Sequence, residues 1–406
     1  MVDTDFAWRL TQGLVRIDSS DPGAYEGEIE RYIKVLVEER LAQLSHPVLD
    51  AVQIAELEVL PGRRNLMITV PGVSDEPRLV YICHMDTVTL GDGWDADITP
   101  LGAVVRDGKL YGRGACDMKG GLACAIAALV HTLERVAADG ALPRRGFSLI
   151  CSVDEEDFMR GSEAAIDAGW VGSREWVLDT EPTDGQIQVA HKGRTWFEIE
   201  MDGVTAHASR PWKGADAVAA MAEVVCSLRR AFAALPVHNE LGPSTITFGQ
   251  IEGGYRPYVV PDHAKVWVDM RLTPPTDTAA ATRMVEQAIA VAEAAVPGCH
   301  GSYTVTGDRP AIERDPNSPL LAALKRAADD VTDADTTVGF FTGYTDTAVI
   351  AGKTGNRNCM SYGPGSLALA HKPNEYVPHA DIVRCQQVLI ALADNVLWDA
   401  SGQVGA

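Results

Sequence analysis

Histidine and acidic residues gather at the ends of several apolar segments in this 406-residue sequence. Each of these apolar segments has the length and composition of a buried β-strand. Because ligands of open α/β sheets bind at the carboxyl ends of strands, we expect the polar residues that follow them to converge. These residues are His84 with Asp86, Asp117, the DEED run at 154–157, and Asp179 with Glu181, and the loop-like segment LALAHKPNEY adds His371.

The types of these residues predict a metal site. Two histidines with several carboxylates are ligands that suit zinc, and also cobalt or manganese. One zinc ion needs three protein ligands and an open position, so the surplus of carboxylates favours two metal ions with one shared carboxylate. Two-metal sites recur in hydrolases, where they bind the attacking and the departing oxygen atoms. Asp86 fits a supporting role, in which its carboxylate accepts the second ring N–H of His84.

Taken one at a time, these residues also fit ordinary structural roles. His84 could be a buried histidine with satisfied hydrogen bonds, and the DEED run could be a solvated group of charges. Asp117 could be the N-cap of the helix that follows it. The metal-site interpretation accounts for all of them together, since each acidic group follows an apolar strand.

The apolar segments alternate with helical patterns, which predicts an α/β fold. That order indicates a mostly parallel sheet with helices on both faces. One or two helices are expected within residues 5–45, and a strong helix at about 120–138. The expected strands lie at 65–70, 78–84, 146–153 and 175–180.

A different order begins near residue 190 and predicts a second domain of the α+β class. Its pattern, βαββαβ, builds a small sheet with two helices on one face. Strand–helix alternation resumes near residue 315. We therefore expect a discontinuous catalytic domain of residues 1–189 and 308–406, with an inserted lid or dimerisation domain of residues 190–307.

The composition excludes some classes of partner and indicates where in the cell the protein is located. The formal net charge of -21 argues against nucleic acid or an anionic membrane, since both select basic surfaces. The N-terminal residues lack the pattern of a secretory signal, and no run of about 18 apolar residues predicts a membrane span. The eight cysteines are scattered without a C-x-x-C pair, which indicates reduced thiols and a cytoplasmic protein.

The motifs, in their order along the chain, resemble those of the two-zinc amidohydrolases. That family includes acetylornithine deacetylase, succinyl-diaminopimelate desuccinylase, aminoacylases and carboxypeptidase G. The resemblance covers nearly the whole chain from about residue 60, and the EPT…AHKG stretch is most similar to the acetylornithine deacetylase branch. It is carried by HMDTV, GRGACDMKGG, VDEED, EPTDGQIQVAHKGRTWFEIEMDGVTAHAS and GPGSLALAHKPNEYV.

The resemblance implies two zinc ions, with cobalt or manganese as other possibilities. Asp117 is similar to the carboxylate that bridges both ions, and a cis peptide bond is expected after it. The glycines around Asp117 would let the backbone adopt the tight turn that this position needs. Asp179 stays an alternative to Glu181, because spacing alone does not separate them. The implied ligands are His84, Asp117, Glu156, Glu181 and His371.

The resemblance also implies roles for residues beside the metals. Glu155 matches the general base, which takes a proton from water and returns it to the leaving amine. His207 matches a lid histidine that steadies the oxyanion, often in the partner subunit of a homodimer. Arg271 matches an arginine that binds a substrate carboxylate. Tyr258 stands where the family commonly has an asparagine, so the substrate contacts differ here.

The expected function is hydrolysis of the amide bond of an N-acyl amino acid by a cytoplasmic enzyme. The partner is a small-molecule substrate, an N-acyl amino acid or a small peptide. A carboxypeptidase or dipeptidase keeps the same chemistry and is the first alternative. A non-catalytic metal-binding protein is the second, although such a protein has no use for a base such as Glu155. The substrate itself does not follow from the resemblance, because pocket substitutions reassign substrates on one fold.

Overall fold

The computed structural model describes residues 2–398 and divides the chain into two compact units. Unit 1 comprises Met1–Val189, Arg314–Phe341 and Thr345–Ala406, and unit 2 comprises Ala190–Glu313 and Thr342–Tyr344. These limits lie close to the predicted limits at residues 190 and 307. Each unit has its own hydrophobic core.

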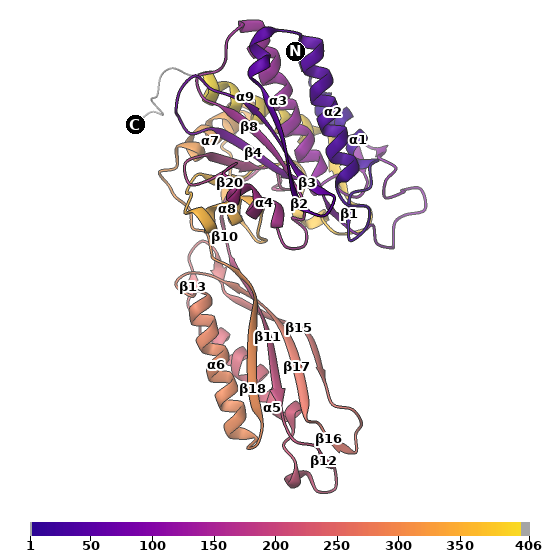
Figure 1. Cartoon of the computed structure of the whole chain (residues 1–406), viewed down its shortest axis with the longest axis vertical. Helices are drawn as coiled ribbons and strands as arrows, with labels where there is room; N and C mark the ends of the chain where they lie inside the picture. The colour runs from indigo at the N-terminus through magenta and orange to yellow at the C-terminus, as the bar shows by residue number, and fades with distance from the viewer. Residues whose placement is uncertain (1, 399–406) are drawn as a thin grey trace. The chain divides into compact units, whose positions relative to one another are not determined.

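A mixed sheet of eight strands forms the centre of unit 1 (Figure 1). Its strand order is β19-β10-β20-β9-β4-β8-β3-β2. The four strands from β20 to β8 are parallel, and antiparallel pairs join β3 and β2 on one side and β10 on the other. The predicted α/β fold is confirmed, with its parallel strands at the centre. The bounds are β2 (Gln53–Leu60), β3 (Arg63–Val70), β4 (Leu79–His84), β8 (Phe147–Ser152), β9 (Trp176–Asp179), β10 (Ile187–His191), β19 (Val338–Phe341) and β20 (Cys359–Ser361).

Helices cover both faces of this sheet. One face contacts α3 and α9, which pack with α1 and α7, while α2 contacts both α3 and β3. The other face contacts α4 and α8. Strands covered on both faces are buried at consecutive positions, as every residue of β4 and of β8 is, and their sequences are mostly apolar. The bounds are α1 (Phe6–Val15), α2 (Gly27–Leu44), α3 (Lys119–Asp139), α4 (Arg160–Asp167), α7 (Pro319–Thr332), α8 (Asp346–Thr354) and α9 (His379–Trp398).

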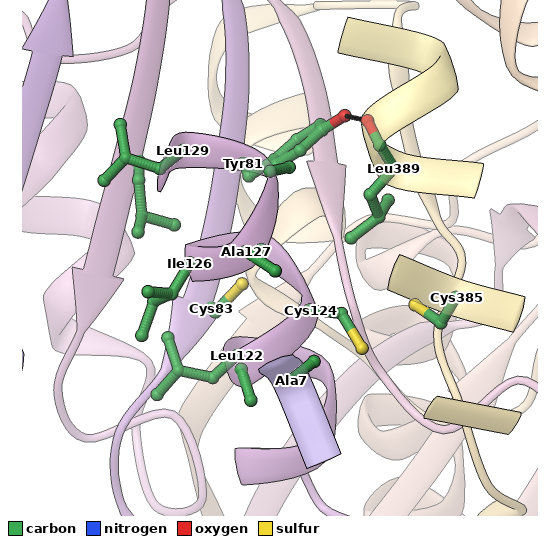
Figure 2. Packing of buried hydrophobic residues seen from close by; sticks show 14 of the residues in the cluster. Ala7, Tyr81, Cys83, Leu122, Cys124, Ile126, Ala127, Leu129, Cys385 and Leu389 are labelled. Carbon is green, nitrogen blue, oxygen red and sulfur yellow. Dashed lines mark hydrogen bonds between the residues drawn. The ribbon is translucent and has the colours of Figure 1, made fainter. Parts of the chain in front are cut away.

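Helix α3 lies at the centre of the core of unit 1. Figure 2 shows its side chains Leu122 and Ile126 among buried residues of β4 and α9, where the Tyr81 hydroxyl donates to the Leu389 carbonyl at 2.9 Å. By length and composition α3 is apolar enough to cross a membrane, but 78% of its most apolar window is buried inside the protein. Burial of this kind is what a core helix shows.

Glycine allows the chain to turn into α3 and to pack closely beside β9. Gly114, three residues before Asp117, has a φ of +81°, a conformation that glycine adopts without strain. A Cβ atom on Gly121 would lie 2.1 Å from the carbonyl oxygen of Thr180, which follows β9. The first turn of α3 therefore lies against the end of β9, and this contact brings the two segments that carry Asp117 and Glu181 together.

Unit 2 contains the predicted βαββαβ order. Its antiparallel sheet has the order β15-β17-β11-β18, and α5 and α6 pack on one face of it (Figure 1). Alternate residues such as Phe197 and Val268 point into the apolar core beneath the helices, while Trp196 and Asp269 lie on the other face. The bounds are β11 (Gly193–Asp202), α5 (Ala217–Ala233), β15 (Thr245–Gly253), β17 (His263–Leu272), α6 (Thr278–Ala295) and β18 (His300–Arg309).

Short elements complete both units. In unit 1, β1 pairs with β5, and β21, β7 and β6 form a three-stranded sheet. In unit 2, β12 pairs with β16 and β13 with β14. The bounds are β1 (Ser20–Asp21), β5 (Thr87–Val88), β6 (Val104–Arg106), β7 (Lys109–Tyr111), β12 (Ala206–His207), β13 (Val237–His238), β14 (Gly242–Pro243), β16 (Val259–Val260) and β21 (Tyr376–Pro378), with 3-10 turns at Pro47–Ala51, Pro211–Lys213 and Leu367–Leu369.

Candidate metal centre

Two imidazoles and several carboxylates converge in unit 1 beyond the carboxyl ends of the parallel strands. His84 ends β4, the acidic run 154–157 follows β8, and Glu181 follows β9. Asp117 precedes α3, and His371 lies in the loop before β21. Neighbouring parallel strands end at the same edge of the sheet, so residues far apart in sequence come together there.

The carboxylate of Asp117 lies between the two histidines. Its Oδ1 is 3.2 Å from His84 Nε2, and its Oδ2 is 3.4 Å from His371 Nε2. Burial opposes the charge of this carboxylate, but hydrogen bonds from His371 and His84 prevail and lower the pKa of Asp117. One oxygen faces each imidazole, as a carboxylate shared by two metal ions requires.

The backbone around Asp117 agrees with one expectation and excludes another. The peptide bond between Asp117 and Met118 is cis, as the resemblance implied. The N-cap of α3 is Met118, and no side chain caps this helix. The interpretation of Asp117 as a helix cap is therefore wrong.

The ring of His84 is oriented by Asp86, but not through the predicted contact. His84 Nδ1 lies 2.9 Å from the backbone carbonyl oxygen of Asp86 and 3.7 Å from its carboxylate. Because a carbonyl only accepts, Nδ1 donates a hydrogen to it, and Nε2 faces the site. The Asp86 carboxylate instead accepts the backbone N–H of Glu156 at 3.0 Å, and burial raises its pKa to about 7. The predicted carboxylate–imidazole contact is corrected accordingly.

The acidic run that follows β8 contributes two side chains to the site. Glu155 is buried, and one of its oxygens lies within 4.8 Å of ligand atoms of His84 and Glu181. Burial raises the pKa of the Glu155 carboxyl well above its ordinary value. Glu156 Oε2 lies 2.9 Å from His371 Nε2, and its buried Oε1 has no hydrogen-bond partner. Asp157, the last residue of the run, is exposed and faces Arg160.

The structure separates the two acidic residues that follow β9. Glu181 Oε1 lies 3.7 Å from His84 Nε2, and burial raises the pKa of Glu181. Asp179 instead accepts a hydrogen bond from the Thr347 hydroxyl at 2.7 Å. Glu181 thus belongs to the cluster, while Asp179 fastens the start of α8 to the sheet.

A buried ion pair that the sequence analysis missed supports the loops of Asp117 and His371. Glu375 Oε1 accepts the backbone N–H groups of Cys116 and Asp117 at 2.9 and 3.1 Å. Its Oε2 lies 2.7 Å from Arg113 Nη1, which also donates to the carbonyl of Lys372 at 3.3 Å. Hydrogen bonds with Asp117 and Glu156 raise the pKa of His371 to about 10. Glu375 lies in the HKPNEY segment. No apolar strand precedes this segment, so its sequence did not indicate that Glu375 belongs to the site.

The donor set fits a centre of two metal ions. Ligand atoms of His84, Asp117 and Glu156 lie within 4.8 Å of one another, as do those of His84, Glu155 and Glu181. So many carboxylates in one buried space repel each other unless cations balance them. The unpaired oxygen of Glu156 adds an available ligand atom. Imidazole and carboxylate donors suit zinc, cobalt or manganese.

The three remaining predicted residues lie in unit 2. His207 in β12 is exposed, and its Nδ1 lies 2.8 Å from the Ser209 hydroxyl. Tyr258 is 61% exposed, and its carbonyl accepts the N–H of Ala208 at 3.1 Å, beside His207. Arg271 lies near the far end of β17, roughly 27 Å along that strand from its first residue at about 3.4 Å per residue. It donates to the Asp269 carboxylate at 2.8 and 3.1 Å. Within one chain, His207 and Tyr258 are therefore remote from Arg271.

The fold and the site together define a metal-dependent hydrolase. A sequence model described as "Peptidase family M20/M25/M40" matches residues 80–395. The chain therefore belongs to this peptidase family and is a hydrolase that acts on amide bonds. The proposed resemblance is confirmed.

Two curated relatives illustrate what this chain is similar to. One is a probable succinyl-diaminopimelate desuccinylase of Staphylococcus epidermidis, 26% identical over 399 residues, covering 91% of this chain and 92% of the relative. Another is the acetylornithine deacetylase of Myxococcus xanthus, 26% identical over 332 residues, covering 80% of this chain and 82% of the relative. Both names occur in the family that the motifs resemble.

Solved structures show the same fold. The aminopeptidase PepT of Bacillus cereus has a TM-score of 0.75 at 22% identity, with 96% of this chain and 98% of that chain covered. The YxeP protein of Bacillus subtilis, described as a dinuclear metal binding peptidase, has a TM-score of 0.69 at 16% identity, with 97% and 99% covered. The likeness extends over both units.

Proposed function

We propose that this chain is a deacylase that hydrolyses the amide bond of an N-acyl amino acid. The observation that carries the proposal is the position of Glu155. This buried carboxylate lies beside His84 and Glu181, yet the cluster has enough other donors to hold two metal ions. A structural metal site has no need of an additional base.

The proposed metal ligands support this chemistry. We assign Asp117 as the bridging carboxylate, because its two oxygens face different histidines. When bound, two zinc ions would supply Lewis acidity for the water and for the amide carbonyl, and cobalt or manganese suits the same donors. The residues that would hold them are His84, Asp117, Glu156, Glu181 and His371.

Glu155 carries the proton in the proposed reaction. Its carboxylate takes a proton from water as the water oxygen attacks the amide carbon. When the C–N bond breaks, Glu155 returns this proton to the departing nitrogen, so a carboxylic acid and a free amine result. A carboxyl whose pKa is raised by burial holds the proton between these steps more readily than an exposed carboxyl.

Residues of unit 2 complete the proposal. We assign His207 to the developing oxyanion, Arg271 to a substrate carboxylate and Tyr258 to the substrate. Because His207 and Arg271 lie far apart in one chain, two copies that pair through unit 2 would be needed for both to serve one site. The eight free cysteines, seven of them buried, support a reducing, cytoplasmic location.

A carboxypeptidase or dipeptidase is the second candidate. The peptidase PepT shares the fold, and a dipeptide presents the same amide bond and terminal carboxylate as an N-acyl amino acid. The chemistry assigned to Glu155 would be unchanged. Only the group on the acyl side of the bond would differ.

The test is hydrolysis of a panel of N-acyl amino acids and dipeptides by the zinc-loaded protein. Glu155→Ala should lower kcat by about 10²–10⁴-fold while two metal ions stay bound, because general acid–base catalysis contributes roughly that factor. Asp157→Ala, an exposed change in the same run, should leave kcat unchanged. Turnover of acylated amino acids alone supports the deacylase, and turnover of dipeptides alone supports the second candidate. Bound metal without turnover of any substrate would contradict both.

A further inference from the structure

A buried group of charges lies behind the acidic run that carries Glu155. We call it the Arg63 network, and it consists of Asp21, Glu26, Arg63, Asp154 and Arg160. Glu26 and Asp154 are fully buried, and Arg63 is 7% exposed. None of these residues has a role in the proposed reaction. Glu26 and Arg63 also precede residues 80–395, which the family model matches.

Arg63 joins the start of α2 to the acidic run. Its Nε and Nη2 lie 2.8 and 2.5 Å from the two carboxylate oxygens of Glu26. Its Nη1 lies 3.3 Å from Asp154 Oδ1. Glu26 Oε1 also accepts the backbone N–H of Asp154 at 3.0 Å. Both the side chain and the backbone of Asp154 are thus held by residues that lie about 90 to 130 positions earlier in the chain.

Asp154 is the residue directly before Glu155, and its backbone conformation is unusual. Its φ of +66° is in the left-handed region, which costs energy for a residue other than glycine. On its other side, Arg160 Nε and Nη2 donate to its carboxylate at 2.6 and 2.5 Å. The surrounding charges therefore hold Asp154 in this conformation.

A second set of contacts holds the residues on either side. Asn65, two positions after Arg63 on β3, accepts the N–H of Val153 at 3.1 Å and donates to the carbonyl of Gly161 at 2.7 Å. The turn between β8 and α4 is therefore attached to β3 at both ends. Because β3 belongs to the central sheet, these contacts fix the turn that carries Glu155 relative to that sheet.

We propose that Arg63 and Glu26 are positioning residues for the general base Glu155. This inference rests on the proposed function of Glu155 and adds the residues that determine its placement. They act through Asp154, whose backbone they hold in the turn, and they do not touch the metal ligands. A misplacement of about 1 Å at a reacting group can cost roughly 10²-fold in rate, so such support has a catalytic consequence.

The experiment compares Arg63→Lys, Arg63→Gln and Glu26→Gln with Arg64→Gln. Arg64 is the next residue of β3, is 45% exposed and pairs only weakly with Glu58 at 3.8 Å, so it controls for a change in this strand. We expect kcat to fall about 10–100-fold in Arg63→Gln and Glu26→Gln, the range typical of residues that orient an active group. KM and the two bound metal ions should be unchanged, and Arg63→Lys should recover part of the activity because it keeps the charge.

A second measurement does not depend on turnover. The amide hydrogens of Asp154 and its neighbours should exchange faster with deuterium in Arg63→Gln and Glu26→Gln than in wild type or Arg64→Gln. Peptides that span 153–161 report this by mass spectrometry. If wild type turns over no substrate, the proposed function fails while the exchange measurement still tests the positioning role.

Two results would overturn the inference. One is unchanged exchange at 153–161 in both Arg63→Gln and Glu26→Gln. The other is a loss of kcat that follows loss of metal or of folded protein in each variant, since the residues would then only stabilise unit 1. Arg63→Lys serves as the folded variant if Arg63→Gln does not fold.

Discussion

At the scale of single residues, Asp117 is held from two directions. Its side chain lies between His84 and His371, and its backbone N–H is bound by Glu375. Arg113 binds the same glutamate and the carbonyl of Lys372, so one ion pair connects the Asp117 turn with the His371 loop. Replacing residues that orient metal ligands typically costs about 10–100-fold in metal affinity or activity.

Replacing Glu375 tests this connection. In Glu375→Gln the two backbone N–H groups keep an acceptor, but Arg113 loses its buried counter-charge. We expect the free energy of unfolding to fall by about 3 kcal/mol, as when one partner of a buried ion pair is removed, and metal affinity to fall about 10-fold. Urea denaturation and titration with a chelator measure the two effects. Glu58→Gln, at an exposed position, is the control, and equal results for the two variants would exclude a supporting role for Glu375.

Glu30 gives a prediction about pH that is separate from the metal centre. Burial and the nearby Glu56 raise its pKa from 4.5 to about 7, while Glu56 is paired with Lys34 at 2.7 Å. A carboxyl with a raised pKa in the folded state loses its stabilising contribution as the pH rises from 4.5 to about 7.

Glutamine imitates the protonated form of Glu30. Glu30→Gln should therefore raise the free energy of unfolding by on the order of 2 kcal/mol at about pH 8, with a much smaller effect near pH 5. Urea denaturation at both pH values measures this difference. Glu28→Gln, an exposed change in the same helix, should show no such pH dependence. An equal effect of Glu30→Gln at both pH values would exclude the raised pKa.

The sequence predicted residues of the centre better than the contacts among them. His84, Asp117 and Glu181 could be found because each stands next to an apolar strand or a helix start. The N–H groups that Asp86 and Glu375 accept could not be predicted, because they belong to the backbone and any residue type supplies them. The Arg113 partner of Glu375 could not be predicted because it lies 262 positions earlier in the chain. Arg63 and Glu26 were not predicted for a different reason. They lie about 90 to 130 positions before Asp154, and only the pairing of β3 with β8 brings Arg63 close.

At the scale of elements, the close packing of α3 on the sheet builds the centre. The start of this helix lies against the residue that follows β9, and Gly121 leaves no space for a side chain there. Three of the four central parallel strands, β4, β8 and β9, and the βαββαβ order were predicted because their periodicity is clear, whereas the three-residue β20 was not. β2 and α4 were not predicted. β2 is only half-buried, and α4 has eight residues, so neither presents a long pattern.

Gly121→Ala tests the contact between α3 and β9. The new Cβ atom would lie 2.1 Å from the Thr180 carbonyl, so the helix must move away from the strand. We expect the free energy of unfolding to fall by about 1–3 kcal/mol, as in overpacked cores, although alanine favours a helix more than glycine does. The melting temperature measures this change. Ala128→Gly, in the same helix, is the control substitution. A higher melting temperature of Gly121→Ala than of the wild type would show that the contact with Thr180 does not limit the stability of the protein.

At the scale of the whole molecule, two cores fold in one chain of net charge -21. The candidate metal centre uses only unit 1, whereas the residues proposed for the oxyanion and the substrate belong to unit 2. Pattern and composition predicted the two units, since each has its own order of strands and helices. The proposed pairing of two copies could not be predicted from such a pattern, because it would depend on which edges of a sheet remain uncovered.

The proposed pairing of two copies can be tested at the edges of the unit 2 sheet. Strands β15 and β18 form these edges, and exposed edges tend to pair with another chain. Ile251 on β15 is 61% exposed, compared with 38% for Val305 on β18, so we expect pairing through β15.

Light scattering should then report twice the chain mass of 43.5 kDa for the wild type and for Val305→Lys, and the single mass for Ile251→Lys. If His207 acts in the site of the second copy, the monomeric variant should keep its two metal ions and lose about 10²-fold in kcat, as when a group that stabilises an oxyanion is removed. Adding a His207→Ala protein with an intact β15 edge would not restore that activity. A wild-type protein that is monomeric and fully active would contradict both the pairing and the role assigned to His207.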